Sequence, residues 1–211
     1  MGLLEQLQQS VIDGEEEATI ALVQQALAEG LPADRILKEG LIAAMAKVGE
    51  LFEAGEYFVP DMLIAAHAMK SGLTILRPRL AEAKVQSIGK VVLGTVQGDL
   101  HDIGKNLVGM MLEGAGFEVI DLCVDVSPQK FAEAVKEHRP QFVGCSALLT
   151  TTMPRMKDVI AELDRSGLRD AVKVMIGGAP ITQQYADDIG ADIFAPDAVL
   201  AARRAQQAIA A

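Results

Sequence analysis

A histidine and a carboxylate lie two residues apart near the middle of the chain. His101 follows Asp99, and the pair is bracketed by Gly98 and Gly104. A histidine whose ring is oriented by a carboxylate is the arrangement in which imidazoles commonly bind metals. The pair comes directly after the apolar run 91–96, which is typical of a buried strand. Ligands of open α/β sheets bind at the carboxyl ends of the strands, so the spacing places His101 at such an edge.

Few other metal ligands accompany His101. The other two histidines, His67 and His138, lie in helical patterns, and the two cysteines, Cys123 and Cys145, lie in apolar runs. We expect both cysteines to be small buried thiols. A zinc or non-haem iron site normally needs three or four protein ligands. A lone histidine therefore favours a metal that arrives inside its own equatorial ring.

Small or hydroxyl-bearing residues, with one leucine, lie at or directly after the ends of two other predicted strands. They are Ser146, Leu148, Thr150 and Thr152 in one segment, and Gly177, Gly178 and Ala179 in another. Residues with little or no side chain allow a large flat ligand to approach the backbone closely. The sequence therefore predicts a site at the same edge as His101 where a large flat ligand lies close to the backbone.

The second half of the chain alternates strand-like and helix-like segments. The predicted strands are 90–96, 117–123, 142–148, 173–177 and 192–195, and the predicted helices are 104–115, 128–137, 153–165, 182–188 and 197–209. This alternation predicts a five-stranded parallel sheet with helices on both faces. The fold class is thus α/β, with a Rossmann-like, flavodoxin-like domain over residues 88–211.

The first half shows only helical spacing of apolar residues. Breaks fall at 13–14, 30–32, 55–60 and Pro78. Four helices with short connections predict a small antiparallel bundle over residues 1–87. The connecting segment, about 81–89, is short and mixed-polar.

Composition excludes several classes of protein. The chain has 211 residues, of which 50% are hydrophobic and 23% charged, and a net charge of −10. These values are typical of a globular protein and argue against nucleic acid as a partner, because nucleic-acid binding needs a basic footprint. We find no signal peptide and no apolar run long enough to span a membrane, and we expect a reduced, cytoplasmic setting.

Three separated motifs resemble those of a known family. They are Asp99-x-His101-x-x-Gly104, Ser146-x-Leu148 and Gly177-Gly178. In this order they resemble the cobalamin-binding motif of methionine synthase and of the corrinoid proteins of methyltransferase systems. The helical half, including 55–60, looks like the helical cap that precedes the cobalamin-binding domain in that family. The resemblance covers nearly the whole chain.

The resemblance implies a bound cobalamin or related corrinoid in the base-off/His-on state. His101 would be the lower axial ligand of cobalt, Asp99 would hold its other ring nitrogen, and Thr152 would end the relay. His101 would release the metal and take up a proton when the methyl group leaves. The residues expected to contact the cofactor are Gly98, Asp99, His101, Asp102, Ile103, Gly104, Ser146, Leu148, Thr150, Gly177, Gly178 and Ala179. Tyr57, Phe58 and Met62 are candidate lid residues of the cap.

The resemblance also implies a function, which is to carry a methyl group on cobalt between a substrate-specific methyltransferase and a second methyltransferase. The second enzyme would deliver it to tetrahydrofolate or to a thiol such as coenzyme M, and a reductive activator protein would be a third partner. The chain would catalyse little alone. The donor, whether methanol, a methylamine, glycine betaine or a methoxylated aromatic, is not specified.

Three alternatives remain open. One is the cobalamin-binding subunit of a B12-dependent isomerase, against which the helical cap speaks. Another is a cobalamin-sensing regulator, which needs a DNA-reading module that the acidic chain does not supply. The last is a receiver-like signalling domain with Asp99 or Asp102 as phosphoacceptor, which gives no role to His101.

Overall fold

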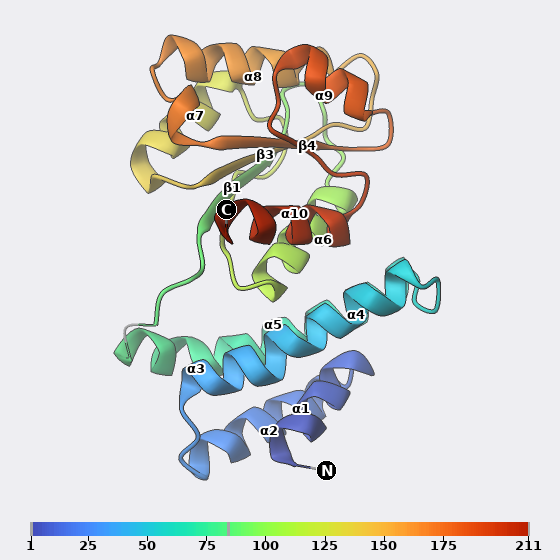
Figure 1. Ribbon diagram of the computed structural model, residues 1–211, viewed down its shortest axis with the longest axis vertical. Coiled ribbons are helices and arrows are strands. Elements are labelled where there is room, and N and C mark those ends of the chain that lie inside the picture. Colours follow the sequence, from blue (N-terminus) through green and yellow to red (C-terminus); the bar gives the residue numbers. More distant parts are fainter. Residues whose placement is uncertain (1, 84, 211) are drawn as a thin grey trace. The chain divides into compact units, whose positions relative to one another are not determined.

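The computed structural model describes residues 2–83 and 85–210, which form two compact units (Figure 1). One unit comprises the chain up to Ser87 together with Glu113–Gly116, and the other comprises Ile88–Leu112 and the chain from Phe117 onward. Lys84, in the expected connecting segment, lies outside the described residues. No helix within the described ranges is both long and apolar enough to cross a membrane.

The first unit is built from helices alone over its described residues up to Ser87. They are α1 (Leu3–Ile12), α2 (Glu16–Ala28), a continuous stretch of α3 (Ala33–Arg35), the π-helical η1 (Ile36–Ile42) and α4 (Ala43–Glu53), and finally α5 (Val59–Glu82). The four predicted helical stretches are thus present. Helical periodicity did not predict the π-helical turn. Gly40 lies in this turn, and a Cβ there would come within 2.6 Å of the Leu7 side chain.

Pro78 lies inside α5, so the predicted break at this residue is wrong. The helix continues to Glu82, with Leu76 and Leu80 buried on either side of the proline. A proline in a helix interior costs about 3 kcal/mol, because it removes one backbone hydrogen bond and crowds the preceding turn. Burial of each leucine contributes about 2 kcal/mol, which offsets that cost and keeps the helix continuous.

The second unit is a five-stranded parallel sheet with strand order β2-β1-β3-β4-β5, which confirms the predicted α/β class. Its elements are β1 (Lys90–Thr95), α6 (Ile103–Gly114), β2 (Glu118–Asp121), α7 (Pro128–His138), β3 (Phe142–Ser146), α8 (Pro154–Arg165), the short η2 (Arg169–Ala171), β4 (Lys173–Gly177), α9 (Gln183–Ile189), β5 (Ile193–Phe194) and α10 (Ala198–Ala210).

The strand order reverses direction at β1. The chain passes from β1 to β2 on one side and then crosses to β3 on the other, so β1 has a neighbour on each side. Helices α7, α8 and α9 cover one face of the sheet, and α6 and α10 cover the other (Figure 1). The hydrophobic core beneath α7 and α8 contains three fully buried side chains, those of Phe131, Met156 and Leu163. The loops after β1 and β3 therefore leave the sheet at its switch point, where doubly wound folds bind ligands.

Candidate functional site

His101 and Asp99 meet in the loop between β1 and α6. The Nδ1 atom of His101 lies 2.7 Å from Oδ1 of Asp99, and the backbone N–H of His101 donates to the same oxygen at 3.1 Å. The Asp99 side chain is fully buried, whereas half of the His101 side chain is exposed. An ionised carboxylate only accepts hydrogen bonds, so Nδ1 carries the hydrogen. Nε2 is then the ring nitrogen with a lone pair to offer.

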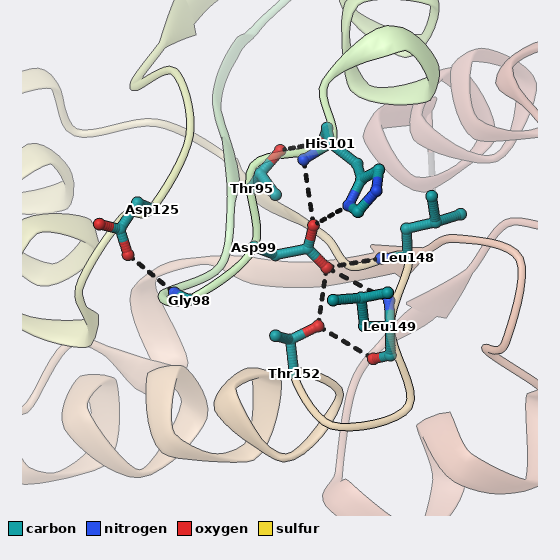
Figure 2. A network of polar contacts seen from close by, with 8 residues as sticks. All are labelled: Thr95, Gly98, Asp99, His101, Asp125, Leu148, Leu149 and Thr152. Atoms are coloured by element: carbon teal, nitrogen blue, oxygen red, sulfur yellow. Dashed lines mark hydrogen bonds and ion pairs between the residues drawn. The ribbon is translucent and has the colours of Figure 1, made fainter.

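The second oxygen of Asp99 is held by the loop between β3 and α8. Oδ2 accepts hydrogen bonds from the Thr152 hydroxyl at 2.7 Å and from the backbone N–H groups of Leu148 and Leu149 at 2.8 and 3.3 Å (Figure 2). Burial alone would raise the pKa of Asp99. The hydrogen bonds from Thr152, His101 and the backbone outweigh burial and hold its pKa far below the usual range. The carboxyl group is therefore ionised at neutral pH.

The structure thus brings together the three residues expected to form the relay. Thr152 is buried, and its hydroxyl also lies 2.9 Å from the Leu149 carbonyl oxygen. A hydroxyl has a single hydrogen to donate. Since an ionised acceptor makes the stronger hydrogen bond, that hydrogen is directed at Asp99.

Four exposed apolar side chains belong to the same two loops and the start of α6. They are Leu100, Ile103, Leu148 and Leu149, with exposed fractions of 71, 75, 43 and 42%. We call these four residues the apolar rim. Single exposed apolar residues are common on proteins, but a group of them beside a functional side chain marks a ligand or partner surface.

The other residues expected at the site lie in the loops after β1, β3 and β4. Gly98 and Gly104 are exposed, and a Cβ on Gly104 would meet no other atom within 4 Å. Thr150 and Ala179 are exposed, Ser146 is half-buried at the end of β3, and Asp102 accepts a hydrogen bond from the Asn106 side chain.

The packing of the strand ends also requires glycine at positions 177 and 178. A Cβ on Gly178, whose φ is +135°, would lie 1.9 Å from the Ala147 carbonyl oxygen, and one on Gly177 would lie 2.8 Å from that of Ala195. Both glycines therefore let neighbouring strand ends approach each other. This packing role was not predicted from the sequence.

The three candidate lid residues differ in exposure. Phe58 is 64% exposed, but Met62 is fully buried, and the Tyr57 hydroxyl donates to the Ile12 carbonyl oxygen. Met62 is thus a core residue, and its interpretation as a lid residue is wrong. Its helical spacing is typical of a methionine that fills a core.

The expectation of two buried thiols is confirmed for Cys145 and wrong for Cys123. Strand β2 ends at Asp121, and Cys123 follows in a left-handed conformation with φ of +69°. Burial raises the pKa of the Cys145 thiol to about 12, so this thiol stays neutral and is a poor metal ligand.

The loop between β2 and α7 also contacts the site, which sequence reasoning missed. The Asp125 carboxylate accepts a hydrogen bond from the Gly98 N–H at 2.7 Å, and the Asp125 N–H donates to the Asp99 carbonyl oxygen at 3.1 Å. In addition, the Thr95 hydroxyl donates to the His101 carbonyl oxygen at 2.9 Å. One signal in the sequence could have identified Asp125, because it follows a predicted strand that ends at the same sheet edge.

His101 lacks the companion ligands that a free metal ion requires among the described residues. Within residues 2–83 and 85–210, no three histidine, cysteine or acidic side chains are grouped so that they could hold an ion. A single half-exposed imidazole, held by a buried carboxylate in loops that also carry the apolar rim, fits a metal enclosed in a macrocycle better than a free ion. Asp99 is fully buried and its oxygens are occupied, so it is not accessible as a phosphoacceptor.

Comparison with known proteins supports this assignment. A family described as "B12 binding domain" matches residues 89–204, and a second family of the same description matches residues 3–77. Dimethylamine corrinoid protein 1 of Methanosarcina acetivorans is 46% identical over 209 residues, covering 99% of this chain and 98% of that protein.

Two solved structures are similar over nearly the whole chain. A cobalamin-binding protein from Desulfitobacterium hafniense DCB-2 superposes with a TM-score of 0.80 at 36% identity, covering 98% of each chain. A chain of the methanol:cobalamin methyltransferase complex from Methanosarcina barkeri superposes with a TM-score of 0.89 at 28% identity, covering 99% of this chain and 80% of that one.

Proposed function

The chain belongs to the B12-binding corrinoid proteins of methyltransferase systems, and on this basis we propose that it carries a methyl group between two methyltransferases. The observation that carries the proposal is the contact between His101 and Asp99. It leaves one imidazole nitrogen for a metal at the switch point of the sheet. The bound corrinoid would supply the cobalt centre that accepts and gives up the methyl group.

We propose that the corrinoid is held base-off and His-on, with Nε2 of His101 as the lower axial ligand. Asp99 keeps the hydrogen on Nδ1 and thereby fixes the tautomer that can bind metal. The apolar rim supports this role, because its side chains provide an uncharged surface beside His101 on which a corrin ring can lie. Gly104 supports it too, since the space beside its Cα is open.

Asp99 also stabilises His101 when it is not bound to the metal. An imidazole that lets go of a metal can take a proton at Nε2, and the resulting cation then faces the buried carboxylate at 2.7 Å. Asp99 itself remains ionised because its oxygens accept hydrogen bonds from His101, Thr152 and the backbone.

The partners follow from this role. We propose a substrate-specific methyltransferase, a second methyltransferase that delivers the group to tetrahydrofolate or a thiol, and a reductive activator protein. The relative with 46% identity is named for dimethylamine, which makes dimethylamine the first methyl donor to test. We further propose that residues 1–87 act as a cap with Phe58 as its exposed aromatic residue, and that residues 88–211 bind the cofactor.

The axial ligand is tested by titrating the protein with hydroxocobalamin and recording the visible spectrum. Wild type should give a base-off/His-on spectrum, and His101→Ala should lose it and bind about a hundredfold more weakly. His138→Ala changes a histidine at the end of α7 and should behave as wild type. An unchanged spectrum in His101→Ala would show that another group binds the metal. Failure of wild type to retain any corrinoid would refute the proposed function.

A further inference from the structure

We propose that Asp125 is a positioning residue that holds the peptide around Asp99 and so aims the His101 ring. This inference rests on the proposed function, because it assigns His101 as the ligand that is positioned. Asp125 lies in the loop between β2 and α7, on the other side of β1 from the loop that carries Thr152.

Asp125 makes two hydrogen bonds to the backbone that flanks Asp99. Its Oδ1 accepts from the Gly98 N–H at 2.7 Å (Figure 2). Its own N–H donates to the Asp99 carbonyl oxygen at 3.1 Å. A hydrogen bond to a charged acceptor is about twice as strong as a neutral one. The two bonds enclose the Gly98–Asp99 peptide, so the direction of the Asp99 side chain depends on the position of Asp125.

The backbone of the β2–α7 loop is fixed against β1. Cys123 and Asp125 both have left-handed conformations, with φ of +69° and +54°. The Thr95 N–H donates to the Cys123 carbonyl oxygen, and the Val126 N–H donates to that of Thr95, each at 3.0 Å. Left-handed residues other than glycine persist where surrounding contacts determine their conformation. The loop therefore presents Asp125 in one orientation.

An ion pair fixes the start of the same loop. The Nζ atom of Lys105, a residue that is only 2% exposed, lies 2.6 and 2.5 Å from the two carboxylate oxygens of Asp121. Asp121 also accepts from the Cys123 N–H at 2.9 Å. Lys105 is in the first turn of α6, four residues after His101. This ion pair thus joins the segment after His101 to the loop that carries Asp125.

Asp99 is consequently held by the loops that follow β2 and β3, the two strands beside β1. The β3 side holds its carboxylate through Leu148, Leu149 and Thr152, and the β2 side holds its backbone through Asp125. Metal sites lose affinity when the partners of a ligand are removed, because the ligand is no longer held in its binding orientation. We therefore expect loss of the Asp125 acceptor to weaken ligation by His101 without touching the cofactor.

The test compares Asp125→Gly with Asp125→Asn. Both residues accept a left-handed conformation, but only asparagine keeps an oxygen that can accept from the Gly98 N–H. Asp125→Gly should bind hydroxocobalamin about tenfold more weakly. It should also show a mixture of His-on and His-off species at saturation, read from the nitrogen hyperfine splitting in the electron paramagnetic resonance spectrum of the cob(II) form. Asp125→Asn should stay within about twofold of wild type, since its amide oxygen still accepts.

A second measurement uses the protein without cofactor. Amide hydrogen exchange at Gly98 should be faster in Asp125→Gly than in wild type or Asp125→Asn, because only the glycine variant lacks the acceptor. Arg139→Gly is the matched control, since Arg139 also has a left-handed φ, of +48°, but ends α7. It should leave affinity, hyperfine splitting and Gly98 exchange unchanged.

The outcomes separate this inference from the proposed function. If Asp125→Gly keeps wild-type affinity and a fully His-on spectrum while His101→Ala loses both, the positioning role is wrong and the axial ligand stands. An equal loss in the glycine and asparagine variants would also overturn the role, because the acceptor would not be what matters. A wild-type spectrum in His101→Ala would instead refute the assignment of His101 as the axial ligand, and failure of wild type to retain any corrinoid would refute the proposed function.

Discussion

Asp99 lies fully buried beneath His101, with Oδ1 at 2.7 Å from the imidazole Nδ1, while half of the histidine side chain remains exposed. One oxygen of Asp99 faces the histidine, and the other faces Leu148, Leu149 and Thr152. The carboxylate thus links the loop after β1 to the loop after β3. Changes to Asp99 should therefore affect both the stability of the folded chain and the binding of the corrinoid.

We expect Asp99→Asn to lower the free energy of unfolding by about 2 kcal/mol. Asparagine has one acceptor oxygen, so its NH2 group must face donors on either the His101 side or the Thr152 side. Corrinoid affinity should fall about tenfold, because the ring tautomer is no longer fixed. Urea unfolding and hydroxocobalamin titration measure the two effects. Asp158→Asn, in an exposed pair with Arg155, should change neither; equal behaviour of the two variants would contradict the role of Asp99.

The stability of the protein should depend more on the hydroxyl of Thr152 than on its methyl group. Thr152→Val keeps the shape of this buried side chain but leaves Asp99 short of a donor, and should cost about 1 to 2 kcal/mol. Thr152→Ser keeps the hydroxyl and should cost less than about 1 kcal/mol, the value of one buried methyl group. Thermal unfolding of the protein without cofactor provides the comparison. Equal losses in the two variants would show that the hydrogen bond contributes nothing.

Gly104→Ala and Gly178→Ala should separate cofactor contact from packing. A Cβ on Gly104 meets no atom within 4 Å, so alanine in this helix should leave stability unchanged or raise it by about 0.5 to 1 kcal/mol. Its corrinoid affinity should nevertheless fall, because the methyl group occupies the space proposed for the cofactor. Gly178→Ala should lose more than about 1 kcal/mol, because its φ of +135° and the Ala147 carbonyl oxygen exclude a side chain. Unchanged affinity in Gly104→Ala would remove Gly104 from the binding surface.

The two thiols should react at very different rates. Cys123 is exposed, whereas Cys145 is buried with a pKa raised to about 12. Since the thiolate is the reactive form, a disulfide reagent such as dithionitrobenzoate should modify one thiol in the folded protein and the second only after denaturation. Cys123→Ser should abolish the reaction of the folded protein. Rapid reaction in that variant would place Cys145 near the surface.

Much of the fold could be predicted because the apolar period changes along the chain. Apolar runs such as the one that contains Val92 alternate with helical patterns, as a parallel sheet requires. The strand β1 ends within one residue of the predicted boundary. Asp99, His101 and Thr152 could be named because they match motifs of a family with the same order of elements. Pro78 was misinterpreted since tertiary burial of its neighbours, which local sequence does not show, keeps the helix intact.

The contacts from the β2–α7 loop could not be predicted in the same way. Asp125 reaches Gly98 only because residues after β2 run beside the end of β1, where Val96 and Val126 form an isolated bridge. The left-handed conformation of Asp125 is uncommon for a residue with a side chain and has no reliable sequence signal. Similarly, the packing of Gly178 against Ala147 depends on how closely two strand ends approach.

The lone imidazole of His101 also affects which metal species the site selects. A hydrated zinc, nickel or copper ion would find one ring nitrogen at this loop, and no three histidine, cysteine or acidic side chains of the described residues are grouped so that they could hold it. Sites with several side-chain ligands bind such ions in the order of their intrinsic affinities, and copper or zinc then competes with the intended metal. Under the proposed ligation by His101, selection among metals is left to the enzymes that build the macrocycle. We therefore expect loading to depend on the supply of finished cofactor, with little competition from free ions.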